Sequence, residues 1–360
     1  MASLQADIFT DLRVIELAGV LAGPSAGYFF AELGAKVIKV ENPATGGDVT
    51  RSWKLKTEDP SQNTSAYFWS VNAGKEFVPL DLTAEEDRGR LYAMVRDADI
   101  VICNYKAGDD LKLGVDYGTL SGMNPKIIYA SISGFGHDSP RTAYDLILQA
   151  ESGFMQMNGE RGSKGLKMPV ALIDLLAGHQ VKEAILIALL KRYRTGSGSH
   201  IHVSLFQSAV ASLANQATNW LVGGQVPQPS GSLHPNIAPY GEIFDTKDRQ
   251  RVTFAIGNNR QFRSLCEILG TGSLAAQPAY STNHHRVVNR QQLYAVLYDY
   301  VKAFLSDDLH KLCLENEIPV GKIRDLKEVF TLPEAREMLR QFATDSGSVE
   351  TVSGNAFRFL

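Results

Sequence analysis

The chain has 360 residues and a hydrophobic content of 44%, which suffices for a large buried core and, by length, for two domains. Its 36 lysine and arginine residues nearly balance 39 aspartate and glutamate residues, so the formal net charge is -3. This balance excludes a general attraction to nucleic acid or to an anionic membrane surface, and we expect neither as a partner.

The cysteines, the histidines and the N-terminal segment indicate the kind of compartment and cofactor. Cys103, Cys266 and Cys313 are widely spaced, with no CxxC pair that would suggest zinc, a redox motif or a disulfide framework. The eight histidines do not fall into a metal-binding spacing, and His200 and His202 are expected to share one face of a strand. Residues 1–17 lack the features of a secretory signal. We therefore expect a cytoplasmic protein without a metal or a prosthetic group.

Short β-rich and helical segments alternate through the first two hundred residues. The predicted strands are 13–17, 36–41, 99–104, 126–134 and 200–205, and the predicted helices are 23–35, 175–194 and 206–222. Such alternation is typical of a parallel sheet with helices on its faces. The sequence therefore predicts an α/β fold with a large Rossmann-like domain.

A segment rich in Gly, Pro and Ser, residues 223–240, separates this region from a second one. After it, two strands and two helices indicate a smaller α+β domain, and residues 322–342 form a charged helical stretch. The predicted strands are 241–248 and 251–257, and the helices lie near 260–269 and 290–305. The expected divisions are a large domain 1–222, a linker or substrate loop 223–240, a small domain 241–320 and a C-terminal segment 321–360.

Asp174 follows an apolar run and immediately precedes the predicted helix 175–194. The simplest interpretation is a helix N-cap, which would stabilise the helix by about 1 kcal/mol. This role is compatible with chemistry, because a helix N-terminus also keeps a nucleophilic carboxylate ionised. The sequence holds no GxSxG string for a serine nucleophile, no P-loop and no GxGxxG fingerprint, so hydrolase and nucleotide-binding motifs give no competing assignment.

Several longer segments resemble the class III CoA-transferase family, which also contains the formyl-CoA and carnitine CoA-transferases and the α-methylacyl-CoA racemases. The resemblance rests on residues 13–51, 72–82, 102–136, 171–178, 194–209, 233–240 and 260–270. It implies a Rossmann-like large domain, a smaller domain and two chains interlocked as a homodimer. It also implies that the segment 321–360 returns to the large domain.

The resemblance implies that Asp174 is the nucleophile of an enzyme that moves CoA from an acyl-CoA thioester to a carboxylic acid. The carboxylate would form a mixed anhydride and then an aspartyl-CoA thioester, so that the activation of the acyl group is conserved. Coenzyme A is then part of the substrate, and no prosthetic group is implied.

The same resemblance implies which residues contact the two substrates. The implied CoA contacts are Arg51, Asn72, Lys75, Asn104, Tyr105, Lys106, Gly134 and Phe135. The implied contacts to the acyl group or acid are Leu21, Ala22, Tyr144, Pro239 and Tyr240. Lys106 stands where many relatives have arginine, and Glu76 where many have a second basic residue.

Two alternative functions stay open. In the racemase branch, a histidine works with the aspartate in moving the α-proton, and Tyr144 stands in the place of that histidine. Tyrosine, with a pKa of about 10, is a poor general base at neutral pH, which favours the transferase. The other alternative is a CoA-binding relative without catalysis, which the retention of Asp174 disfavours. Leu21, where formyl-CoA:oxalate enzymes have glutamine, cannot donate a hydrogen bond to oxalate and leaves a larger or more apolar acid open.

Overall fold

The short β-rich runs of the sequence become the strands of one parallel sheet in this computed structural model, which describes residues 8–344 and 347–359. Its strands are β1 (Arg13–Leu17), β2 (Lys36–Glu41), β3 (Glu76–Pro79), β4 (Ile100–Cys103), β5 (Ile128–Ser133) and β6 (Ser199–Ser204). The strand order is β3-β2-β1-β4-β5-β6, with every neighbouring pair parallel. The order changes direction between β1 and β4, the switch point at which doubly wound folds bind their ligands. The predicted α/β fold with a central parallel sheet is confirmed.

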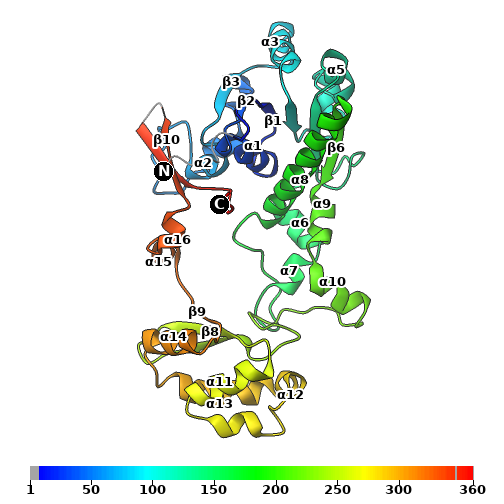
Figure 1. The fold of residues 1–360 in the computed structure, drawn as a ribbon. Coiled ribbons are helices and arrows are strands. Elements are labelled where there is room, and N and C mark those ends of the chain that lie inside the picture. The colour runs from blue at the N-terminus through cyan, green and yellow to red at the C-terminus, as the bar shows by residue number, and fades with distance from the viewer. Residues whose placement is uncertain (1–7, 345–346, 360) are drawn as a thin grey trace. The chain divides into compact units, whose positions relative to one another are not determined.

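The chain divides into two units and passes between them four times (Figure 1). Unit 1 comprises the described residues of Met1–Met155, Lys167–Pro227 and Glu337–Leu360. Unit 2 comprises Gln156–Leu166 and Gln228–Arg336. Unit 2 thus includes the short excursion 156–166, which no feature of the sequence set apart.

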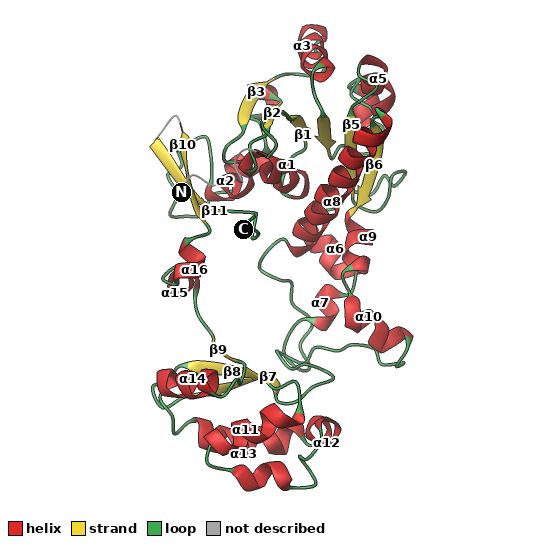
Figure 2. Ribbon diagram, in the orientation of Figure 1, coloured by secondary structure: helices red, strands yellow, loops and turns green. Residues whose placement is uncertain are grey.

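Helices flank the sheet of unit 1 (Figure 2). The helices of the described residues up to 227 are α1 (Ala22–Glu32), α2 (Ala66–Asn72), α3 (Glu85–Arg96), α4 (Asp109–Lys112), α5 (Tyr117–Met123), α6 (Asp145–Glu151), α7 (Phe154–Met157), α8 (Leu172–Thr195), α9 (Leu205–Ala211) and α10 (Ala214–Leu221), with 3-10 turns η1 (Pro43–Thr45) and η2 (Val49–Ser52). The sequence predicts a single helix over 206–222, and this prediction is wrong. Ala214 has a φ of 48°, a left-handed value that a right-handed helix cannot accommodate.

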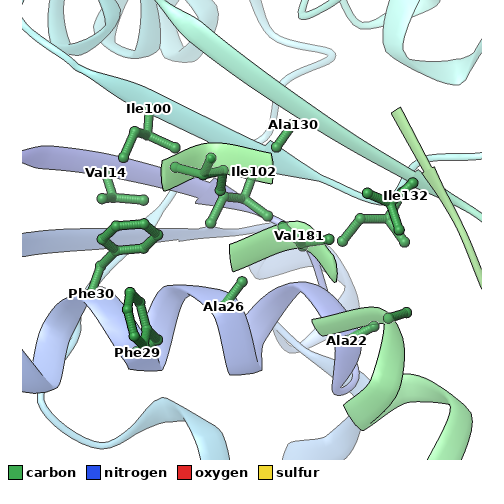
Figure 3. Packing of buried hydrophobic residues seen from close by; sticks show 14 of the residues in the cluster. Val14, Ala22, Ala26, Phe29, Phe30, Ile100, Ile102, Ala130, Ile132 and Val181 are labelled. Atoms are coloured by element: carbon green, nitrogen blue, oxygen red, sulfur yellow. The ribbon is translucent and has the colours of Figure 1, made fainter. Parts of the chain in front are cut away.

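Helices α1 and α8 build the main core against one face of the sheet. Figure 3 shows Phe30 of α1 and Val181 of α8 packed with Val14, Ile100 and Ile102 of the strands. All five side chains are fully buried. The first half of α1 carries small residues, which lets its backbone approach the sheet closely, whereas its two phenylalanines fill the wider space that follows.

The C-terminal part of unit 1 is a β-hairpin formed by β10 (Leu339–Thr344) and β11 (Gly347–Val352). The predicted helical stretch 322–342 is therefore wrong over its last residues. The ring of Phe342 in β10 lies 6.3 Å from that of Tyr28, and the Tyr28 hydroxyl lies 3.0 Å from Thr351 Oγ1. These contacts with α1 are distant in the chain, so local helical propensity could not reveal them.

Unit 2 has its own antiparallel sheet and its own core. The strands are β7 (Tyr240–Asp245), β8 (Arg251–Ala255) and β9 (Val320–Lys322), and the helices are α11 (Asn259–Ile268), α12 (Asn283–Val288), α13 (Arg290–Val301), α14 (Ser306–Glu315), α15 (Leu326–Val329) and α16 (Pro333–Arg336), with the turn η3 (Gly272–Ala276). Strand β8 lies between β7 and β9. Phe244, Phe254 and Leu265 are among the buried residues that join this sheet to α11 and α13. The two units thus have separate cores.

The helices and the cysteines can be compared with the predictions made from the sequence. Among the described residues, no helix is both long enough and apolar enough to cross a membrane. All three cysteines are unpaired and buried. Cys103 lies in a core cluster of unit 1, and Cys266 and Cys313 lie in the core of unit 2. The thiols therefore serve as small apolar side chains in these cores.

Candidate active site

Loops that follow three strands of the parallel sheet line a cavity of about 290 Å³ in unit 1. They follow β1, β4 and β5, and α8 contributes one further wall. Because the carboxyl ends of parallel strands meet at one edge, this is the crevice expected at the switch point. Of the residues that the sequence predicts, the cavity brings together Leu21, Ala22, Asn104, Tyr105, Lys106, Gly134, Tyr144 and Asp174.

The loop after β1 is held in place by side chains from elsewhere in unit 1. Asn104 accepts a hydrogen bond from the Gly19 N–H at 3.0 Å and donates one to the Gly19 carbonyl at 2.9 Å. The Asp48 carboxylate accepts from the Val20 N–H at 3.2 Å. Val20 has a φ of 70°, which a β-branched residue adopts only when its surroundings impose it. Both polar groups of Asn104 thus shape the loop that borders the cavity.

The N-terminus of α1 borders the same cavity through Leu21 and Ala22. The first hydrogen bond of the helix runs from the Ser25 N–H to the Leu21 carbonyl at 2.8 Å, and residue 24 is a proline. The Ala22 and Gly23 N–H groups therefore precede the helical ladder, and no described residue accepts from them. Such donors at the positive end of a helix suit an oxygen that becomes negatively charged.

Asp174 lies in the first turn of α8, and the N-cap residue of that helix is Ala171. The interpretation of Asp174 as the N-cap is therefore wrong. Asp145 of α6 supplies the cap, because its Oδ1 accepts from the Ile173 N–H at 2.7 Å and from the Asp174 N–H at 3.4 Å. The Asp174 carboxylate itself has no described hydrogen-bond partner, so it stays available on the cavity wall.

The environment of Asp174 changes its acidity. The residue is 6% exposed, and burial together with the nearby Asp145 carboxylate raises the pKa of Asp174 to about 7. Burial is the larger cause, because an apolar surrounding disfavours the charged form. A buried carboxyl with a raised pKa on a cavity wall is the kind of group that carries chemistry.

A further residue near Asp174, which no sequence pattern indicates, is Tyr67 of α2. Burial first, and then the carboxylates of Asp174 and Asp145, raise the pKa of Tyr67 to about 12. Tyr67 also packs against the apolar cluster that includes Leu21, which lines the cavity. A neutral phenol therefore lies near the carboxylate at physiological pH. A tyrosine inside an aromatic-rich helix gives no local signal of this position.

Arg141 is a second residue that lines the cavity and that no sequence motif indicates. Its guanidinium carbon lies 3.6 Å from the centre of the Phe135 ring, and Nη2 lies 2.5 Å from the Glu151 carboxylate. Phe135 does not line the cavity itself, and instead supports Arg141. Lys106 is the other cation on the wall, and no described carboxylate forms an ion pair with it. The cavity therefore holds two cations and one carboxylate.

Lys75 and Asn72, implied as CoA contacts, have their polar groups inside unit 1. Lys75 Nζ lies 2.8 Å from Glu16 and donates to Asn72 Oδ1 at 2.9 Å, and the whole side chain is buried. Burial lowers the pKa of Lys75 to about 8 against the opposing effect of Glu16. The same Glu16 pairs with Lys39, which also pairs with Asp48, each at 2.9 Å. CoA contacts at residues 72 and 75 would have to come from backbone or carbon atoms.

Arg51 lines a larger cavity of about 780 Å³, together with Gly46, Gly47, Gly74 and parts of Lys75. Its Nη2 lies 2.6 Å from the Glu41 carboxylate, and its guanidinium carbon lies 3.9 Å from the Phe68 ring centre. The Arg51 side chain is only 13% exposed. The cavity is thus lined by two of the segments implied for CoA, those around Arg51 and Lys75. The Arg51 guanidinium, however, is already paired with Glu41.

The remaining predicted residues, Pro239 and Tyr240, belong to unit 2, where the Tyr240 N–H donates to Glu242 at 2.6 Å. Their contact with a substrate stays a prediction.

His200 and His202 do share one face of β6, as predicted. They lie 3.2 Å and 2.9 Å from the hydroxyls of Ser131 and Ser133 on β5, and both rings approach His137. Burial, followed by the proximity of His137, lowers the pKa of both. Within residues 8–344 and 347–359, no group of three or more His, Cys, Asp or Glu is arranged to hold a metal ion.

Comparison with known proteins gives a consistent set of relatives. A family model described as CoA-transferase family III matches residues 9–359. Succinate–glutarate CoA-transferase from Agrobacterium fabrum is 40% identical over 348 residues, which cover 94% of this chain and 86% of that protein. Acetyl-CoA:oxalate CoA-transferase from Acetobacter aceti is 37% identical over 341 residues, 92% of this chain and 85% of that protein. A CAIB/BAIF family protein from Brucella suis has a solved structure with 38% identity and a TM-score of 0.83, covering 99% of this chain and 93% of that one.

Proposed function

The chain belongs to CoA-transferase family III, and we propose that it carries CoA between two carboxylic acids on the side chain of Asp174. As a member of this family it is an acyl-CoA:carboxylate CoA-transferase. The observation that carries the proposal is the position of Asp174, whose carboxylate lines the cavity without a described hydrogen-bond partner. Its neighbours on the wall, Leu21 and Ala22, begin α1 beside unpaired backbone donors.

The proposed reaction proceeds through two intermediates on Asp174. The ionised carboxylate attacks the thioester carbonyl of the donor, the carbon–sulfur bond breaks, and a mixed anhydride and CoA thiolate form. The thiolate then attacks the aspartyl carbonyl of the anhydride, which releases the donor acid and leaves an aspartyl-CoA thioester. The acceptor carboxylate attacks this thioester, and the released thiolate attacks the acceptor side of the second anhydride. The products are the new acyl-CoA and the free Asp174 carboxylate.

Two features of the site support this chemistry. The tetrahedral intermediates carry negative charge on oxygen, which the Ala22 and Gly23 N–H groups could stabilise from the N-terminus of α1. Residue 23 must be glycine for the start of α1 to lie this close to Ala18, since a Cβ there would lie 2.4 Å from Ala18 Cβ. The burial that raises the pKa of Asp174 also leaves the carboxylate weakly solvated, which favours nucleophilic attack.

For substrates we propose short dicarboxylic acids, with succinyl-CoA as donor and glutarate as acceptor. The relatives named above act on succinate and glutarate or on oxalate, according to their names. A cavity of about 290 Å³ is at the lower end of ligand-pocket sizes, which fits a short acyl chain. Leu21 offers no hydrogen bond to the carboxylates of oxalate, which favours the longer acids.

We further propose that Asn104, Tyr105 and Lys106 face the CoA arm at the cavity, with the nucleotide in the larger cavity at Arg51. Support comes from the loops themselves, because both cavities are lined by the chain segments that the resemblance implies. Lys106 is exposed and forms no ion pair with a described residue, so a phosphate could bind it without breaking an internal contact.

The racemase alternative is not favoured by the site. That reaction needs a second proton-transfer group across the α-carbon, and no histidine is among the residues that line the cavity. Tyr144 lines it, directly before the first residue of α6. A tyrosine is a weak general base, so the arrangement supports transfer of CoA rather than of a proton.

We also propose a homodimer of interlocked chains in the cytoplasm. Helix α8 buries Val181 and Ile185 against the sheet and yet leaves Ile187, Leu190 and Tyr193 exposed. A helix with apolar residues on both sides is expected to be covered on both. A second copy of the chain would provide that cover. The unpaired cysteines fit a reducing compartment.

Intact-mass spectrometry tests the covalent mechanism. Incubation with succinyl-CoA should add the mass of CoA less one water to the protein, and peptide mapping should locate the adduct, or its borohydride-reduced product, at Asp174. Asp174→Ala should bind acyl-CoA, form no adduct and lose at least 1,000-fold in exchange rate, because the nucleophile is gone.

A control variant tests whether the loss of the adduct is specific to the carboxylate of Asp174. Asp308→Asn removes an exposed carboxylate in unit 2 and should form the adduct at the normal rate. An Asp174→Ala protein that exchanges CoA at the wild-type rate would refute the proposed nucleophile.

A further inference from the structure

The cavity that holds the Asp174 carboxylate is also lined by an arginine, which no step of the proposed reaction uses. Arg141 lies in the loop between β5 and α6, and it lines the same cavity as Asp174, Gly134 and Tyr144. The reaction at Asp174 consumes one carboxylate of the substrate. A cation elsewhere on the wall is therefore available to a different part of that substrate.

Arg141 is held in one orientation by two contacts. Its guanidinium group stacks on Phe135 at 3.6 Å, and its Nη2 pairs with Glu151 of α6 at 2.5 Å. A guanidinium group has five N–H donors in a fixed plane, and the Glu151 contact uses one edge of that plane. Among the described residues, no other side chain accepts from the Arg141 guanidinium. The remaining donors are thus positioned and unused.

We infer that Arg141 selects dicarboxylic substrates by binding the carboxylate remote from Asp174. This inference rests on the proposed function and specifies what the cavity recognises. A planar guanidinium group matches a carboxylate with two parallel hydrogen bonds, which gives both affinity and orientation. One carboxyl carbon would then lie at Asp174 and the other at Arg141, with a short methylene chain between them. Acids that carry a positive charge, or long apolar chains, would be disfavoured.

Lys106, the second cation on the wall, is less suited to this role. Both cations are exposed, but Lys106 also lines a neighbouring cavity with His137 and Asp138. No aromatic ring within 8–344 and 347–359 supports its ammonium group. A flexible point charge in this position attracts anions without fixing their geometry. Such a contact suits a CoA phosphate.

A competition between two acceptors isolates this contact. Wild-type and variant enzymes receive succinyl-CoA with equal concentrations of glutarate and valerate, which have the same chain length but differ in the remote carboxylate. Mass spectrometry of the initial products gives the ratio of glutaryl-CoA to valeryl-CoA. Both acceptors draw on the same CoA-loaded enzyme, so damage to the fold or to the donor step lowers both products and leaves their ratio unchanged.

Arg141→Leu should lower the product ratio about 10- to 100-fold, the range expected for a charge-assisted hydrogen bond. Arg141→Lys should give an intermediate ratio, because the charge stays and the fork is lost. Two controls should keep the wild-type ratio. Lys106→Gln changes the other cation on the wall, and Arg90→Leu removes an exposed arginine that is likewise paired with a carboxylate, Asp87.

The outcomes are distinguishable. An active Arg141→Leu enzyme with the wild-type ratio would overturn the inference and leave the proposed function intact. A loss of the ratio in Lys106→Gln alone would assign the selection to Lys106 and also overturn it. If wild-type enzyme exchanges CoA between no pair of acids, the proposed function fails, and the inference fails with it.

Discussion

At the scale of single residues, the site depends on a carboxyl group placed where ionisation is unfavourable. Burial and the charge of Asp145 raise the pKa of Asp174 from 3.8 to about 7. The folded protein therefore holds a proton at Asp174 in a pH range in which the unfolded chain has lost it. Function and stability make opposite demands on this side chain.

The pH dependence of stability should reveal this conflict. Below about pH 3 the carboxyl is protonated in both states and carries no penalty. As pH rises to about 7, the unfolded state binds fewer protons than the folded state, so the free energy of unfolding falls. Asp174→Asn should remove this slope and stabilise the protein increasingly across the window, by at most about 4 kcal/mol above pH 7. Urea unfolding of both proteins from pH 4 to 8 measures the difference.

The matched control for this prediction is Asp308→Asn, which changes an exposed carboxylate. It should give a difference from wild type that does not vary across the window. An Asp174→Asn difference that is likewise constant with pH would contradict the raised pKa.

At the scale of elements, the position of Asp174 depends on how closely α1 and α8 approach each other. Gly178 of α8 faces Ser25 and the Ala22 carbonyl of α1. A Cβ at residue 178 would lie 2.1 Å from Ser25 Oγ and 3.1 Å from the Ala22 carbonyl oxygen. The helices that carry the carboxylate and the backbone donors are thus in contact at a glycine.

Gly178→Ala should therefore separate the two helices at the site. We expect a loss of about 1–3 kcal/mol in the free energy of unfolding, typical of overpacking, and a fall in kcat/KM. Gly89→Ala on α3 is the control, because no atom lies within 4 Å of its added Cβ. That variant should be neutral or stabilised by up to about 1 kcal/mol through helix propensity. Equal behaviour of the two variants would contradict the close contact.

Some helices and strands are predicted correctly from local sequence, and others are not. The strands 13–17 and 36–41 are predicted residue for residue, because β-rich runs bounded by polar residues are a local signal. The sequence predicts too late a start for α8, because the cap of this helix comes from Asp145 in another helix. It does not indicate the hairpin near the C-terminus, because contacts of Phe342 with Tyr28 fix that hairpin. Each error concerns a contact between distant parts of the chain.

At the scale of the whole molecule, the alternation of strands and helices sufficed to predict the fold class, but not the site. Asp174, Leu21 and Lys106 came from the family resemblance, and the structure places all three on one cavity. Arg141 could not be found, because neither a motif nor the spacing of residues relates it to Asp174. The resemblance implies a CoA contact at Lys75, but only the fold reveals that the charge of Lys75 is buried with Glu16.

The association state is the prediction at this scale. If two chains interlock, light scattering after gel filtration should give twice the 39.4 kDa mass of the chain. The mass should persist after dilution to nanomolar concentration, because separation would require partial unfolding of a chain. The exposed apolar face of α8 gives the physical reason for a partner. A monomer mass at micromolar concentration would refute the dimer.

The buried network of Glu16, Lys39, Asp48 and Lys75 has a consequence for the evolution of this protein. Two carboxylates and two ammonium groups neutralise each other inside unit 1, and Asp48 also holds the Val20 loop of the site. Loss of one member leaves an unpaired buried charge, at roughly 3–5 kcal/mol, a large share of the stability of a typical domain. Natural variation at these positions should therefore occur in compensating pairs, with single changes purged by selection.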